Sequence, residues 1–95
     1  MGIIVCGIKI PIYYHIYMKN RKKYPDLIQL GQNIRNLRKL KRFTQESLAF
    51  KTGIDRSYIG GIERGERNVS FLTLSTIAKC LSCDIAQLTK GIPCD

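Results

Sequence analysis

Apolar residues recur every three or four positions along most of the chain, which is the spacing that gathers them on one face of an α-helix. The longest such pattern occupies residues 26–40, where polar and basic residues separate Leu27, Leu30, Ile34, Leu37 and Leu40. It predicts an amphipathic helix of roughly four turns, beginning near Asp26 and directing its leucines and isoleucine toward a core.

Four shorter helices are predicted downstream, each preceded by a residue type that caps helix N-termini. We expect them at 45–52 after Thr44, at 56–64 after Asp55, through 81 after Ser70, and at 85–90 after Asp84. Their inward positions would be Leu48, Ala49, Ile59, Ile62, Leu74, Ile77, Ala78 and Leu81. Gly53, Gly65 and Gly91 stand where helices should end, so the pattern predicts an all-α, five-helix domain.

Residues 1–25 follow a different pattern. The first 18 are apolar and rich in Ile and Tyr, but Lys9, Pro11 and His15 interrupt them, and a membrane-spanning helix needs ~20 residues. Their composition suits a strand, yet the rest of the chain offers no partner strand. We therefore predict a basic N-terminal extension over 1–25, with disorder as an alternative, and a DNA-binding domain over 26–95. A sharper hypothesis makes Met18 the natural start, which an intact mass corresponding to Met1 would contradict.

Charge adds a hint about partners. The chain has 16 Lys and Arg against 7 Asp and Glu, for a formal net charge of +9. Such a chain attracts polyanions, but basic tails are often merely solvated, so charge alone does not decide for nucleic acid.

Little in the composition suits a metal site, a cofactor or catalysis. Cys80 and Cys83 have the spacing of half a zinc site, but Cys6 and Cys94 lack a matching pair, so we expect the first two in the core. No secretory signal is evident, which favours a reducing cytoplasm. No paired carboxylates, nucleophile–base pair or phosphate-cradling loop is visible. We therefore expect no enzyme, no cofactor and no small-molecule ligand.

The informative segment is 45–64, QESLAFKTGIDRSYIGGIER. Two short helices that cross steeply approach closely, so a small residue suits their contact, and Ala49 stands there. The turn between them needs a positive φ, which Gly53 adopts without steric cost. Apolar residues that would hold the second helix against the core are Leu48, Ile54, Ile59 and Ile62. This is the pattern of a helix-turn-helix.

The opposite face of the second helix carries Arg56, Ser57, Gly60 and Gly61, which we expect to form one exposed stripe. Arg donates two hydrogen bonds to guanine, and Ser reaches several base edges. Adjacent glycines cost a helix about 1 kcal/mol each relative to alanine. Either a close approach to DNA or tight packing against another helix would account for them, and we favour DNA.

In TQESLAFKTG and DRSYIGGIERGERN the chain resembles the lambda-repressor-like (Cro/cI, XRE) helix-turn-helix family, most closely its restriction–modification controller proteins. The similarity covers about residues 30–91. It implies that Gln45 contacts a phosphate, that Arg56 and Ser57 face bases, and that Tyr58 touches the sugar–phosphate backbone. It further implies that Arg67 and Asn68 meet DNA and that Arg38 and Glu63 form an interior ion pair. At the position of Gly60 the family more often has a polar residue, so this chain departs from the family pattern there.

The sequence thus predicts a transcription regulator that binds a palindromic double-stranded DNA operator as a homodimer, without a membrane role. The predicted DNA-binding residues are Gln45, Asp55, Arg56, Ser57, Tyr58, Gly60, Gly61, Arg64, Arg67 and Asn68. We place the dimer surface near Ile85, Leu88 and Ile92, which are too apolar to leave exposed. The alternatives are a phage-type repressor, an antitoxin of the same fold, a protein-interaction module that has lost DNA binding, and membrane association through 1–18.

Overall fold

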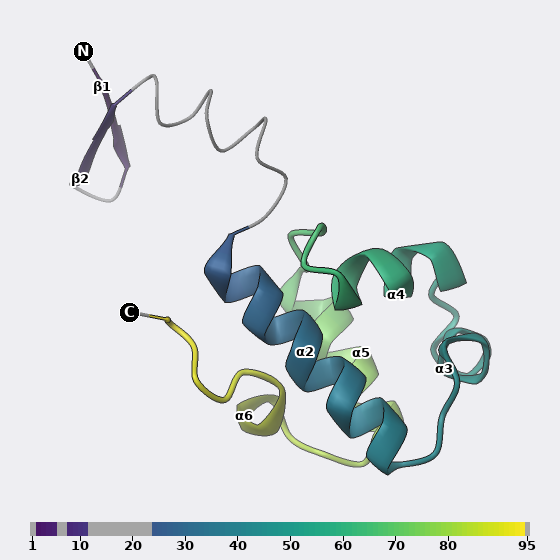
Figure 1. The fold of residues 1–95 in the computed structure, drawn as a ribbon. Helices are drawn as coiled ribbons and strands as arrows, with labels where there is room; N and C mark the ends of the chain where they lie inside the picture. Colours follow the sequence, from purple (N-terminus) through teal and green to yellow (C-terminus); the bar gives the residue numbers. More distant parts are fainter. Residues whose placement is uncertain (1, 6–7, 12–23, 95) are drawn as a thin grey trace.

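The computed structural model describes residues 2–5, 8–11 and 24–94. From residue 24 onward the chain forms five helices, α2 (Pro25–Leu40), α3 (Gln45–Thr52), α4 (Arg56–Glu63), α5 (Phe71–Cys80) and α6 (Ile85–Leu88). Helix α2 runs the length of this domain, α5 lies behind it, and α3 and α4 are side by side at one end (Figure 1). The predicted all-α, five-helix fold is confirmed for this part of the chain.

The predicted start signals are the observed caps. Thr44, Ser70 and Asp84 each accept a hydrogen bond from the backbone N–H three residues further on, and Asp55 accepts one from Ser57. The last three helices end one or two residues earlier than predicted, as is common where terminal turns tighten or fray.

The core lies between α2, α4, α5 and α6, with α3 closing one side. Most predicted inward positions are buried, and the buried apolar set comprises Leu30, Ile34, Leu48, Ile59, Ile62, Leu74, Ile77, Ala78, Leu81 and Leu88. Leu27, Leu37 and Ala49 are partly buried. Leu40 is exposed, because it is the last residue of α2 and the chain turns away directly afterwards through Arg42, at φ 64°. It is 73% exposed.

A close contact between α2 and α4 depends on Gly31. A Cβ atom there would lie 2.6 Å from the carbonyl oxygen of Glu63, closer than side-chain atoms normally approach. The absence of a side chain lets α2 pass directly beneath the C-terminal turn of α4. This approach, which the apolar pattern did not predict, sets the position of α4 on the domain.

The extension contains a two-stranded antiparallel hairpin, β1 (Gly2–Val5) and β2 (Ile8–Pro11), in which Ile3 pairs with Ile10. We expected strand composition without a partner and considered only the rest of the chain. The partner is instead the adjacent segment, so disorder does not describe these eight residues. Predictions about Cys6, His15, Met18 and the basic stretch 19–23 lie outside the described residues. Of the helices described, none combines the length and apolarity that crossing a bilayer requires.

Candidate nucleic-acid interface

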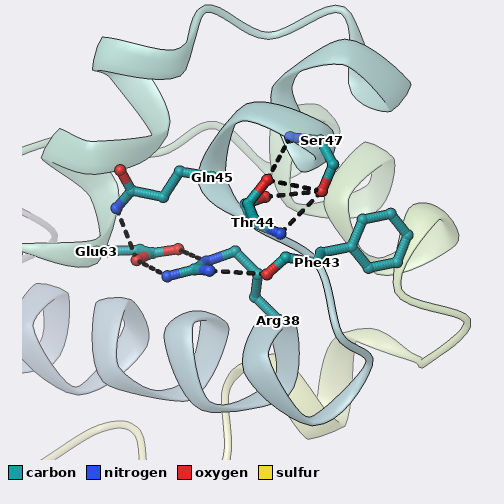
Figure 2. A network of polar contacts seen from close by, with 6 residues as sticks. All are labelled: Arg38, Phe43, Thr44, Gln45, Ser47 and Glu63. Atoms are coloured by element: carbon teal, nitrogen blue, oxygen red, sulfur yellow. Dashed lines mark hydrogen bonds and ion pairs between the residues drawn. The ribbon is translucent and has the colours of Figure 1, made fainter.

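Helices α3 and α4 form the predicted helix-turn-helix. A capping box begins α3, because the Thr44 hydroxyl accepts from the Ser47 backbone N–H and the Ser47 side chain bonds back to the Thr44 backbone (Figure 2). Gly53 ends α3 in the left-handed conformation at φ 74°, as predicted. The chain then reverses into α4 over two residues, Ile54 and Asp55.

A buried polar network holds this pair of helices against α2 (Figure 2). The Arg38 guanidinium donates to both carboxylate oxygens of Glu63, at 2.6 and 3.0 Å. This confirms the predicted ion pair. The same guanidinium donates to the backbone carbonyl of Phe43 at 2.8 Å, and the Gln45 amide donates to Glu63 at 3.0 Å. Three helices therefore meet at the Glu63 carboxylate, and Arg38 also connects the turn before α3 to this network.

Gln45 thus has a role that the sequence did not indicate. Its side-chain nitrogen carries two hydrogens, and one of them is directed inward at Glu63. Nothing in the local sequence predicts this contact, because the two residues are 18 positions apart. The hydrogen bond fixes the N-terminal turn of α3 relative to the C-terminal turn of α4.

Arg56 and Ser57 are exposed in the first turn of α4, as predicted. Asp55, the cap, accepts hydrogen bonds from the Ser57 hydroxyl and from the Ser57 backbone N–H, the latter at 3.2 Å. The bond from the Ser57 hydroxyl is the main cause that lowers the pKa of Asp55 below its ordinary value, and the backbone N–H groups of Ser57 and Tyr58 add to it. The Asp55 carboxylate is therefore occupied in holding the start of α4.

The prediction that Gly60 and Gly61 form part of an exposed stripe is wrong. Both are buried, although their positions on α4 share the face of Arg56 and Ser57. Arginines further along the chain cover them: a Cβ at Gly60 would lie 3.1 Å from Arg64 Nη1, and one at Gly61 would lie 3.1 Å from Arg67 Cγ. The glycines thus accommodate arginine side chains, neither of the two explanations we considered.

Of the remaining predicted residues, Tyr58 lies in the first turn of α4, and the other three lie at the end of α4 and in the loop after it. The Arg67 guanidinium lies over the Tyr58 ring, 5.3 Å from its centroid. Arg64 pairs with Glu66 at 3.2 Å in an exposed ion pair, and Asn68 is exposed. The structure therefore gathers Gln45, Tyr58, the two glycines, Arg64 and Arg67 around the outer surface of α4, which also presents Arg56 and Ser57.

The predicted dimer residues are placed differently. Leu88 is completely buried in the core of its own chain, and Ile85 and Ile92 pack partly against that core. The reason is that α6 contacts both α2 and α5, and the Asn33 side chain also donates to the Leu88 carbonyl at 2.9 Å. The prediction is therefore wrong for Leu88, which its own chain covers, and it stays a prediction for the partly buried Ile85 and Ile92. The large apolar residues that are exposed in the described part of the chain are Tyr24, Leu40, Phe50, Phe71 and Leu72.

Two of the described cysteines behave as small core residues, as predicted. Cys80 and Cys83 are partly buried against the core. Burial raises the pKa of the Cys83 thiol, and the nearby charge of Asp84 acts in the same direction. Among the described residues no cluster of three metal-ligating side chains occurs.

Comparison with known proteins adds independent information. Residues 34–88 match the helix-turn-helix family HTH_3. The Control protein C.SmaI from Serratia marcescens is 42% identical over 59 residues, which are 62% of this chain and 70% of that protein. The crystal structure of the restriction-modification controller protein C.AhdI from Aeromonas hydrophila matches with a TM-score of 0.67 and 48% identity, over 68% of this chain and 98% of the other. The crystal structure of SinR, a master regulator for biofilm formation, in complex with DNA matches with a TM-score of 0.60 and 33% identity, over 62% of this chain and 95% of the other.

Proposed function

Since the chain belongs to the HTH_3 helix-turn-helix family of DNA-binding transcription regulators, we propose that it is a controller-type regulator that binds a palindromic operator as a homodimer. It acts in the cytoplasm, on double-stranded DNA, and without catalysis. The observation that carries the proposal is the exposure of Arg56 and Ser57 on the first turn of α4, on a helix that the buried network fixes to the rest of the domain.

Arg56 is the principal base-reading residue in this proposal. Its side chain is exposed at the N-terminus of α4, the end of a recognition helix that enters the major groove. A guanidinium donates in bidentate fashion to guanine O6 and N7, and such a contact is worth about 1–3 kcal/mol of discrimination against the wrong base.

Ser57 has a more restricted role than its residue type alone suggests. Its hydroxyl hydrogen is donated to the Asp55 carboxylate, so its oxygen is left with lone pairs. We therefore assign it to accept a hydrogen bond from an amino group, N6 of adenine or N4 of cytosine. This assignment predicts a base preference that a serine with a freely rotating hydroxyl would lack.

Phosphate contacts set the register of α4 in the groove. The second hydrogen of the Gln45 amide, the Arg64 and Arg67 guanidinium groups and the Asn68 amide are the donors around the outer surface of α4. Tyr58 contacts the sugar–phosphate backbone beside them.

Two copies are needed because a domain of this size buries too little DNA for high specificity. A palindrome with half-sites about one helical turn apart matches a twofold dimer. We assign the interface to the first turn of α5, where Phe71 and Leu72 are 67% and 76% exposed. Phe50 is also exposed but belongs to α3, which with α4 forms the proposed DNA-facing pair.

The proposal is tested by titrating the protein against a labelled fragment from immediately upstream of its own gene, with excess nonspecific duplex. Arg56→Ala is compared with Lys90→Ala, which removes one exposed positive charge just after α6, a helix that packs on α2 and α5. We expect nanomolar binding of the wild type and a loss of about 1–3 kcal/mol for Arg56→Ala, against little change for Lys90→Ala. Equal, weak and strongly salt-dependent binding by all three proteins would contradict base readout on this fragment.

A further inference from the structure

Helix α4 has only eight residues, and two of them are adjacent glycines. Glycine destabilises a helix interior relative to alanine, so a reason for each is needed. At Gly61 the missing side chain matters for a neighbour: a Cβ atom would lie 3.1 Å from Cγ and 3.2 Å from Nε of Arg67. These atoms belong to the middle of the arginine side chain, which therefore rests directly on the backbone of α4.

The backbone after α4 turns Arg67 back toward the helix. Gly65 has φ +78°, and the backbone N–H of Glu66 donates to the Gly61 carbonyl at 2.9 Å. Arg67 then extends along α4 past Gly61, and its guanidinium reaches the Tyr58 ring, 5.3 Å from the centroid. Gly61 and Tyr58 are three positions apart and so lie on one face of the helix.

From this geometry we infer that Gly61 is a positioning residue for DNA binding, because it seats Arg67 across α4 and against Tyr58. The inference rests on the proposed function. A long arginine side chain loses rotamer freedom when it binds a phosphate, and a side chain already held in place loses less. This position of the Arg67 side chain also brings its guanidinium and the Tyr58 ring together on the surface that presents Arg56.

The neighbouring glycine offers a matched comparison. A Cβ at Gly60 would meet Nη1 of Arg64 at 3.1 Å, and Gln45 Oε1 only at 3.7 Å. The nearest atom is then the far end of an exposed, flexible side chain that can move aside. A methyl group at position 60 is therefore accommodated, whereas one at position 61 displaces the middle of Arg67 and with it the contact to Tyr58.

The test measures binding of the full chain to a mixed-sequence duplex of about two helical turns, at several salt concentrations, by fluorescence anisotropy. We expect Gly61→Ala to weaken binding about tenfold and to reduce the salt slope toward that of Arg67→Ala, since a phosphate contact is lost. Gly60→Ala should weaken binding less than Gly61→Ala, because it shifts only the far end of Arg64. Thr76→Ala on α5, outside the proposed DNA-facing pair, should leave binding unchanged. In an Arg67→Ala background, Gly61→Ala should cause no further loss, because its effect acts through Arg67.

Thermal unfolding separates this role from damage to the fold. The melting temperature of Gly61→Ala should equal or exceed that of the wild type, since alanine favours the helix. Two results would overturn this inference and leave the proposed function intact. One is that Gly61→Ala binds with wild-type affinity and salt slope. The other is that Gly61→Ala weakens binding as much in the Arg67→Ala background as in the wild type. If the wild type binds no duplex, the proposed function fails and the inference fails with it.

Discussion

Glu63 is the residue on which the geometry of the candidate nucleic-acid interface depends. It receives hydrogen bonds from Arg38 of α2 and Gln45 of α3 while belonging to α4. Burying such charges costs desolvation free energy, so the network adds little net stability beyond what apolar residues would provide. Its effect is to fix α4, which carries the base-reading residues, relative to α2 and α3.

Removal of one charged partner should therefore be costly. We predict that Arg38→Met lowers the free energy of unfolding by about 3–5 kcal/mol, because it leaves Glu63 buried without its cation. Arg35→Met, an exposed position on the same helix, should change it by less than about 0.5 kcal/mol. Urea denaturation of both variants gives the comparison, and equal midpoints would show that the pair is not fixed in the core.

The cap of α4 predicts a pH dependence. The pKa of Asp55 is lowered in the folded protein, mainly by the hydrogen bond from the Ser57 hydroxyl, so the cap contributes its full stabilisation above the unfolded pKa of about 4. The contribution is lost as pH falls below that value. Asp55→Asn keeps an acceptor that does not titrate. The melting-temperature difference between wild type and variant should shrink from pH 7 toward pH 3, whereas a constant difference would contradict the assignment.

At the scale of elements, local signals placed the helices well because capping and glycine conformations act within a few residues. The bounds of α3 agree with those predicted, and Thr44, Asp55, Ser70 and Asp84 are all caps. Burial by other elements was harder to predict. Leu88 was expected at a dimer surface because it is too apolar to leave exposed, but α2 and α5 of its own chain enclose it. Gly60 and Gly61 were expected to be exposed because the sequence does not reveal that Arg64 and Arg67 fold back over them.

The capping box of α3 can be tested by itself. Thr44→Ala removes the acceptor for the Ser47 backbone N–H, and we expect a loss of about 1 kcal/mol in the free energy of unfolding. Thr76→Ala is the matched control. Its hydroxyl donates to the Leu72 carbonyl within α5, and alanine is the better helix former there, so stability should be unchanged or slightly raised. Similar losses in both variants would argue against a special role for the cap.

At the scale of the whole molecule, the family resemblance that residues 44–53 and 55–68 suggested is confirmed by the match to HTH_3 and by the similarity to C.SmaI and C.AhdI. Long-range arrangement was less accessible to sequence reasoning. The hairpin of β1 and β2 escaped prediction because its partner strands are neighbours within the extension, where a partner was not considered. Predicting the dimer surface from sequence would require knowing which apolar residues the core leaves uncovered.

That surface leads to a prediction about assembly. Light scattering should find a dimer at tens of micromolar for the wild type, a monomer for the double variant Phe71→Ser/Leu72→Ser, and a dimer for Phe50→Ser. The reason is that association covers the apolar first turn of α5, whereas α3 stays free for DNA. A wild-type monomer would argue against the homodimer, and a dimeric double variant would place its interface elsewhere.

In the proposed function, α4 reads a specific DNA sequence in two symmetric copies. The most direct measurement is selection of bound duplexes from a randomised pool by the purified protein, which requires no assumption about the operator. We expect enrichment of an inverted repeat whose half-sites are centred about one helical turn apart and contain a guanine that Arg56→Ala no longer selects. A pool that remains random after several rounds, although the protein binds it, would show that the chain is a nonspecific polycation and would contradict the claim.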